Sequence, residues 1–168
     1  MARAYNFCAG PAVLPEEALL EAQKELLDFK GSGMSVLECS HRGKEYAAVH
    51  DEAAANLRKL MKLSDDYAAL FLQGGASTQF AMVPMNLLTS GQTADYVNSG
   101  AWASKAIKEA KLIGKVNVAA DCGKEIPTRV PFEKEMKLTP GAAYVHITSN
   151  ETISGAQYKT FPRTEAPL

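Results

Sequence analysis

The sequence predicts an α/β fold whose core is a mostly parallel sheet covered by helices on both faces. Apolar runs of strand length alternate with stretches of helical periodicity along the chain. The runs are apolar at nearly every position, as in strands that are buried on both faces of a parallel sheet. In such folds ligands bind beyond the carboxyl ends of the strands. We therefore expect a three-layer domain with a ligand site at that edge.

The chain begins with an irregular segment, residues 1–14, that contains a Gly-Pro break. A helix is expected next, because Pro15 suits the first helical position and apolar side chains recur on one face as far as Phe29. Two glycines shortly afterwards should end it. Apolar positions at helical spacing predict a second helix over residues 44–62.

A glycine turn separates two apolar runs in the middle of the chain. Residues 67–72 are expected to form a buried strand, and a helix should follow the turn. Gly74 and Gly75 permit a positive φ and a close approach, while Ser77 and Thr78 are residue types that cap helices. The first amides of such a helix can bind a phosphate or carboxylate. A turn that uses glycine only for its geometry, and binds nothing, remains an equal alternative.

Further strands are expected at residues 93–97, 115–120 and 142–149. A helix that ends near Ile113 should connect the first two, and one or two helical turns are expected within residues 132–138. The segments that follow the strands would then lie at one edge of the sheet. These segments are residues 74–78, 99–102 and 150–152.

Trp102, the only tryptophan, belongs to the second of these segments. An indole at such a position either packs against its neighbours or offers a surface on which a flat ring stacks. A phosphate site and a stacking ring at the same edge favour a phosphorylated aromatic cofactor.

His41 and Arg42 are adjacent in a loop, an arrangement that can bind an anionic group because arginine donates paired hydrogen bonds. A solvated polar turn is the commoner interpretation of such a pair. The three histidines and three cysteines lack the spacing of metal ligands, so no metal site is expected. No Gly-x-Ser-x-Gly motif is present either.

Composition restricts the remaining classes of function. A net charge of −1 provides no basic field for nucleic acid or for a membrane surface. The start lacks the apolar core of a signal peptide, and no stretch reaches transmembrane length. Separated cysteines without a CxxC favour a reducing compartment, so we expect a cytoplasmic protein.

Over nearly its whole length, and in the same order, the chain resembles the N-terminal part of the phosphoserine aminotransferase family, pyridoxal phosphate (PLP)-dependent enzymes of class V. The segments that carry the resemblance are Asn6–Ala12, Ser40–Glu45, Gln73–Phe80, Ala94–Val97 with Gly100–Trp102, Ala106–Ala110 and Asn150–Gly155. The resemblance implies the type I fold of PLP-dependent transferases, similar to aspartate aminotransferase. Residues 15–168 would then form an incomplete large domain, with its remainder and the small domain absent.

The resemblance also implies the residues of the cofactor site. The backbone of Ala76 and Ser77 would bind the phosphate of PLP, Trp102 would stack on its ring, and Thr152 would bond its phenolic oxygen. Some family members carry Gly-Arg where this chain has Ala76 and Ser77. A phosphate contact from that arginine side chain must be absent here or supplied elsewhere.

By the same resemblance, Arg42 and His41 would contact the anionic groups of the substrates. The implied reaction transfers an amino group between L-glutamate and 3-phosphohydroxypyruvate, giving phosphoserine, in serine biosynthesis and also in pyridoxine biosynthesis. A homodimer is implied as well.

The lysine that forms the Schiff base in the family would lie beyond Leu168, and no lysine of this chain stands in a matching context. We therefore expect no catalytic residue in this chain and no transamination by it alone. Other functions stay open. They are a class V aminotransferase of the alanine–glyoxylate type, a non-catalytic phosphate-binding α/β module, and a structural fragment without a ligand.

Overall fold

The computed structural model describes residues 3–122 and 127–168. The chain forms two compact units, Met1–Phe71 and Leu72–Leu168, here called the first and second units. The predicted boundary between an irregular segment and the large domain, at residue 15, stays a prediction.

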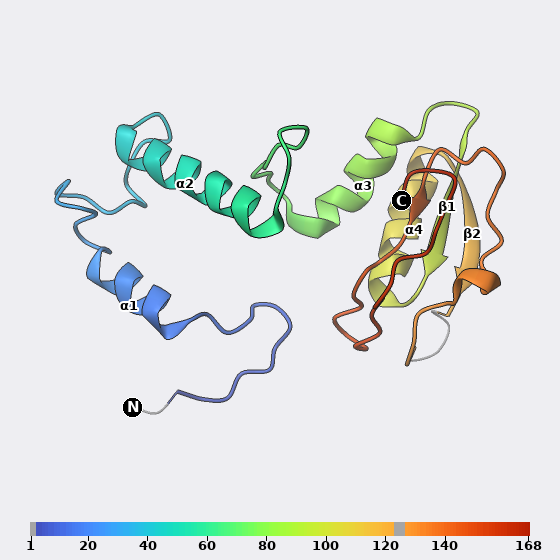
Figure 1. The fold of residues 1–168 in the computed structure, drawn as a ribbon, viewed down its shortest axis with the longest axis horizontal. Coiled ribbons are helices and arrows are strands. Elements are labelled where there is room, and N and C mark those ends of the chain that lie inside the picture. Colours follow the sequence, from blue (N-terminus) through green and yellow to red (C-terminus); the bar gives the residue numbers. More distant parts are fainter. Residues whose placement is uncertain (1–2, 123–126) are drawn as a thin grey trace. The chain divides into compact units, whose positions relative to one another are not determined.

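The first unit contains helices α1 (Glu16–Lys24) and α2 (Lys44–Met61), drawn in blue to cyan-green in Figure 1. The extent predicted for α2 is confirmed, but the prediction that the first helix continues to Phe29 is wrong. The chain instead folds back on itself, because the Phe29 N–H donates to the Met34 carbonyl at 2.8 Å and the Asp28 carboxylate accepts from the Gly33 N–H at 2.7 Å. An aspartate that bonds nearby amides competes with helical bonding.

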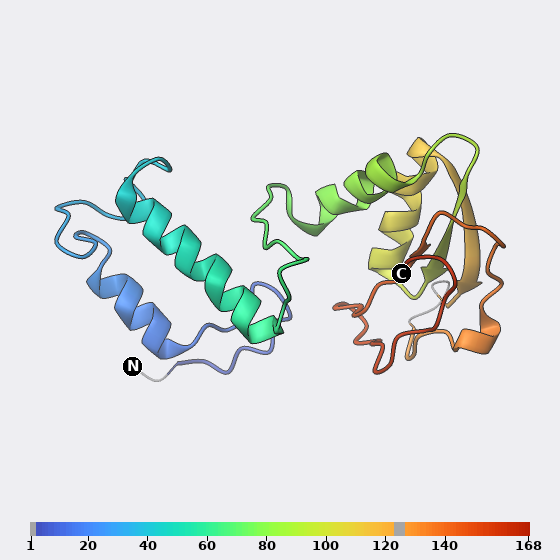
Figure 2. The same cartoon turned by 45° about the horizontal axis from the view of Figure 1, so that its top comes forward.

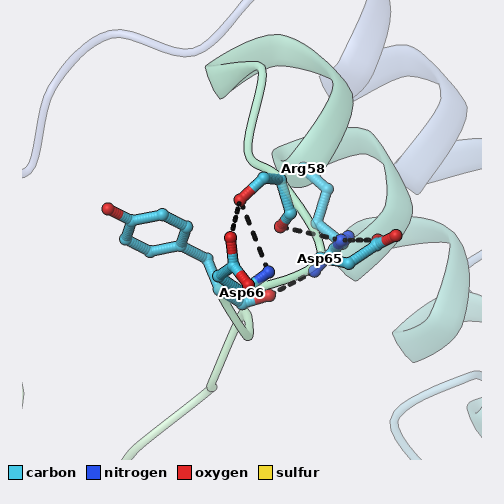
Figure 3. A network of polar contacts seen from close by, with 5 residues as sticks. Arg58, Asp65 and Asp66 are labelled. Atoms are coloured by element: carbon cyan, nitrogen blue, oxygen red, sulfur yellow. Dashed lines mark hydrogen bonds and ion pairs between the residues drawn. The ribbon is translucent and has the colours of Figure 1, made fainter.

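The C-terminal end of α2 is tied to the segment that follows it (Figure 3). The Arg58 guanidinium donates to the Asp65 carboxylate at 2.7 Å, to the Ser64 carbonyl at 3.0 Å and to the carbonyl of Tyr67. The Ser64 hydroxyl in turn donates to the Asp66 carboxylate at 3.0 Å. A cation in the last turn of a helix also interacts favourably with the helix dipole. These contacts determine the direction in which the chain leaves α2.

The second unit contains the sheet. Its elements are α3 (Gly75–Leu87), β1 (Thr93–Asn98), α4 (Ala101–Ile113), β2 (Lys115–Asp121), the 3-10 turn η1 (Glu133–Glu135) and β3 (Val145–His146). The strands have the order β2-β1-β3 and pair in parallel, so β1 lies in the centre (Figures 1 and 2). The predicted α/β class with a parallel sheet is confirmed.

The core of the second unit lies between β1 and α4. Residues Ala94 to Val97 are fully or almost fully buried, and the buried side chains of α4 recur at helical spacing: Ala103, Ala106, Ile107 and Ala110. The Tyr96 and Tyr144 hydroxyls are 2.8 Å apart, and the ring of His146 stacks on that of Tyr96. Burial raises the pKa of both tyrosines and lowers the pKa of His146, so all three side chains favour their neutral forms.

Two strand predictions need correction. Residues 67–72 form no strand, and Leu70 is 71% exposed. An extended run becomes a strand only where its amides and carbonyls find a neighbouring strand, and the described residues supply none here. The strand expected over 142–149 is limited to β3, because on its outer side the Val145 N–H donates to the Pro167 carbonyl in an irregular segment.

An exposed ion pair beside η1, between Arg129 and Glu135, allows the electrostatics of the structure to be tested. Arg129 donates two hydrogen bonds to the Glu135 carboxylate, at 2.7 and 2.9 Å. These bonds, with one from the Phe132 N–H, lower the pKa of Glu135 from 4.5 to about 2. Because the folded pKa lies below the unfolded one, the stabilisation is present above pH 4.5 and is lost as the pH falls toward 2.

Replacing Arg129 by methionine should therefore raise the pKa of Glu135 toward its usual value, since the larger cause of its depression is removed. A pH titration of the Glu135 carboxyl carbon by NMR measures this. The matched control is Lys134→Met, which removes a neighbouring charge that contributes less. An equal response of the pKa to both substitutions would contradict the assignment.

Candidate functional site

Two of the predicted site segments meet at the carboxyl edge of the sheet. Residues 99–102 lead from β1 into α4, and residues 150–152 follow the neighbouring strand β3. The indole N–H of Trp102 donates to the Thr152 hydroxyl at 2.8 Å. The predicted convergence of these two segments is confirmed, and it brings together two of the residues assigned to the cofactor.

Glu151 joins the same two segments from inside the protein. Its side chain is fully buried. One carboxylate oxygen accepts from the Trp102 N–H at 2.9 Å, and the other accepts from the Ala103 N–H at 2.9 Å and the Ser99 hydroxyl at 3.3 Å. Amides in the first turn of a helix lack intrahelical acceptors, and a negative charge there is stabilised by the helix dipole. Glu151 thus caps α4 from a distant part of the sequence.

Reasoning from the sequence missed this role of Glu151. The available signal was an acidic residue directly after one parallel strand, where the helix that follows the neighbouring strand begins. The capping residues expected for a helix are normally looked for next to its own start. A cap contributed from another segment becomes visible only when the order of the strands is known.

Gly100 lies against Glu151 at the start of α4. A Cβ added at this glycine would lie 2.8 Å from the Glu151 carboxyl carbon and 2.9 Å from one of its oxygens. Such distances are too short for any other residue. The glycine is therefore required by the close approach of the carboxylate and by its own φ of +157°, which other residues rarely adopt.

The indole of Trp102 is half-buried, and a lysine covers one of its faces. The Lys105 ammonium lies 4.4 Å from the ring centroid, within the range of a cation–π interaction. A flat ligand ring could therefore stack only on the opposite face of the indole while Lys105 keeps this position.

The glycine turn adopts the backbone conformation expected of it. Gly74 has φ +88°, and a Cβ there would lie 2.0 Å from the Thr78 hydroxyl oxygen, so this position requires glycine. The expectation that Ser77 and Thr78 cap the helix is wrong. Helix α3 begins at Gly75 without a side-chain cap, which places both hydroxyl residues inside its first turn. The amides of Ala76 and Ser77 are thus left without a capping side chain.

The structure does not bring this turn together with Trp102 and Thr152. Among residues 3–122 and 127–168, no hydrogen bond or ring contact links residues 74–78 to that pair. The start of α3 is the end of the helix that points away from the sheet (Figures 1 and 2). Because residues 67–72 form no strand of the sheet, nothing places the turn at the sheet edge.

His41 and Arg42 belong to the first unit, in the turn that leads into α2. The turn is closed by Ser40, whose hydroxyl accepts from the Arg42 N–H at 3.2 Å and whose carbonyl accepts from the Gly43 N–H at 2.7 Å. Both side chains are exposed. Their contact with a substrate stays a prediction.

Within the part of the chain that the structure describes, no group of three or more His, Cys, Asp or Glu side chains is arranged to hold a metal ion. In the same residues no helix is both long enough and apolar enough to cross a membrane.

Comparison with known proteins identifies the family. The model of the family "Aminotransferase class-V" matches residues 4–163. A phosphoserine aminotransferase of Niallia circulans is 57% identical over 162 residues, which are 96% of this chain and 45% of the relative. The chain thus spans about half the length of the curated relatives it matches.

Solved structures agree. Phosphoserine aminotransferase from Bacillus circulans subsp. alkalophilus superposes with a TM-score of 0.91 at 56% identity, over 99% of this chain and 46% of that one. The PLP-bound phosphoserine aminotransferase of Trichomonas vaginalis has a TM-score of 0.91 at 40% identity, over 99% and 47%. The parallel sheet with Trp102 at its carboxyl edge is thus part of a known fold, and this chain belongs to the class V aminotransferase family.

Proposed function

We propose that this chain forms part of the cofactor site of a PLP-dependent phosphoserine aminotransferase. The observation that carries the proposal is the Trp102–Thr152 hydrogen bond at the carboxyl edge of the sheet, in a chain of the class V family. The indole supplies a surface for a flat ring, and the Thr152 hydroxyl beside it can bond an oxygen on that ring. A relative with PLP bound, 40% identical, supports the choice of cofactor.

The two helix starts of the second unit differ in a way that fits a phosphorylated ligand. The start of α4 already holds the buried carboxylate of Glu151, so a second anion would be repelled there. The start of α3 has no side-chain cap, and its first amides belong to Ala76 and Ser77. We assign the phosphate to that backbone. Since residues 74–78 make no hydrogen bond or ring contact with Trp102 or Thr152 in this structure, binding of one PLP molecule at both places requires the start of α3 to lie against the carboxyl edge of the sheet in the full protein. When bound, PLP supplies the electron sink that amino transfer requires.

The finer parts of the proposal concern the substrates and the assembly. We propose L-glutamate and 3-phosphohydroxypyruvate as substrates, in serine biosynthesis and also in pyridoxine biosynthesis. The guanidinium of Arg42 and the ring of His41 would bind their anionic groups. A cytoplasmic homodimer is part of the proposal, with the lysine that binds PLP outside residues 1–168. The name phosphoserine aminotransferase, shared by the relatives described above, supports the substrate class.

The test of this function is a titration of the full protein and its Trp102→Ala variant with PLP. Visible circular dichroism reports the bound PLP. Loss of a stacking ring removes on the order of 1 kcal/mol or more, so the dissociation constant should rise about fivefold or more. Phe132→Ala, which removes another partly exposed aromatic ring of the second unit, is the control and should leave the affinity unchanged.

Failure of the unaltered protein to bind PLP would overturn the proposal, as would equal binding by the Trp102→Ala variant. The substrate is tested separately, by comparing amino transfer to 2-oxoglutarate from phosphoserine and from alanine. A preference for alanine would favour the alanine–glyoxylate type.

A further inference from the structure

We propose that Glu151 is a positioning residue for the cofactor site, which holds Trp102 and Thr152 in register for a flat ring. The inference rests on the proposed function and extends it to a residue that lies beneath the site. Because the Glu151 side chain is fully buried, it acts on a ligand only through its neighbours.

The first argument is that two separate links join the same pair of segments. The Glu151 carboxylate accepts from the backbone N–H of Trp102 at 2.9 Å. The next residue, Thr152, accepts from the indole N–H of that same tryptophan at 2.8 Å. A single link would leave a pivot about which the indole could turn. The two links together determine both the position of the Trp102 backbone and the orientation of its ring.

The second argument is that the segment carrying Glu151 is itself held in place. The Glu151 N–H donates to the Ala156 carbonyl at 2.8 Å, and its carbonyl accepts from the Gly155 N–H at 2.7 Å. An antiparallel bridge between Asn150 and Gln157 closes the same turn. Both backbone groups of Glu151 are therefore bonded within the turn, so the carboxylate is presented to α4 from a rigid support.

The third argument concerns the chemistry of the side chain. Both carboxylate oxygens accept from backbone amides. One accepts from the Trp102 N–H, and the other accepts from the Ala103 N–H and from the Ser99 hydroxyl. Glutamine has the same shape but only one acceptor oxygen, so its amide group would turn N–H bonds toward a backbone N–H. If Glu151 only filled space, its replacement by glutamine would leave the position of Trp102 unchanged. If its carboxylate positions Trp102, the same replacement will disturb the indole.

The experiment compares Glu151→Gln with Glu109→Gln in the full protein. Glu109 is a half-buried glutamate farther along the same helix, so its change removes an equal charge away from the helix start. The first readout needs no cofactor: the ¹H–¹⁵N signal of the Trp102 indole, assigned by its loss in Trp102→Phe. In Glu151→Gln this signal should shift or split, and the dissociation constant for PLP should rise about tenfold. Glu109→Gln should change neither.

The outcomes separate the two proposals. If the unaltered protein binds PLP and Glu151→Gln leaves both the indole signal and the affinity unchanged, the positioning role is overturned and the proposed function stands. If the unaltered protein does not bind PLP, the proposed function is overturned and the positioning role with it.

If Glu151→Gln does not fold, Ser99→Ala serves as the second variant. It removes only the hydroxyl that donates to the carboxylate at 3.3 Å and leaves both backbone amides bonded. The carboxylate would then be held by two donors instead of three, so the indole signal should shift or split and the PLP dissociation constant should rise about two- to threefold. A folded Ser99→Ala variant with no change in either quantity would overturn the inference.

Discussion

Replacing Asp95 by alanine is expected to destabilise the second unit by about 2–4 kcal/mol, because half-buried donors lose a fully buried carboxylate acceptor. Asp95 lies fully buried in the central strand β1. Its carboxylate accepts from the Asn117 side chain on β2 at 2.8 Å, and from the backbone N–H and the hydroxyl of Thr139 at 2.6 and 2.7 Å. One side chain therefore joins the central strand to its neighbour and to the loop before β3.

Urea denaturation followed by Trp102 fluorescence measures this effect, since the tryptophan lies in the same unit. Glu165→Ala removes an exposed carboxylate from that unit and should change the free energy of unfolding by about 0.5 kcal/mol or less. Similar losses in the two variants would show that the buried network contributes little to stability.

Replacing Gly100 by alanine is the second change with a large expected effect, a loss of about 2–4 kcal/mol. The new Cβ would lie 2.8 Å from the Glu151 carboxyl carbon in a fully buried position. The carboxylate must then move away from the amides of Trp102 and Ala103. The cost therefore combines steric overlap and the loss of a helix cap with the strain of placing alanine at φ +157°. The melting temperature should fall accordingly.

Gly141→Ala is the control for backbone strain. Gly141 has φ +70°, a conformation unfavourable for alanine, but a Cβ there would meet no atom within 4 Å. Its substitution should cost about 1 kcal/mol from strain alone. If Gly100→Ala costs no more than this control, the close approach of Glu151 does not determine the residue at position 100.

Local patterns predicted two helices and two strands closely: strands β1 and β2 lie within a residue of the predicted 93–97 and 115–120. Helix α2 and helix α4 end within a residue of their expected bounds, because a helix satisfies its hydrogen bonds within a continuous segment. Residues 67–72 have the apolar composition of a strand but find no partner. Strand formation depends on neighbours that can come from anywhere in the chain, so composition alone does not decide it.

For the candidate site too, local patterns predict some features, and others depend on distant segments of the chain. Local patterns in the sequence predicted a glycine turn and a single tryptophan as candidates, and the family resemblance added Ala76, Ser77 and Thr152. Periodicity also predicted the parallel α/β class, since it depends only on which side chains are apolar. These properties are local, and no knowledge of the partners is needed to recognise them.

Only the tertiary structure decided how those residues are held. The order β2-β1-β3 makes β1 and β3 neighbours, and this brings Thr152 to Trp102 and seats Glu151 on the start of α4. The same structure leaves the glycine turn without a side-chain cap. The physical reason is that hydrogen bonds between distant segments depend on strand order and register, which arise from the packing of the whole unit and leave no local pattern in the sequence.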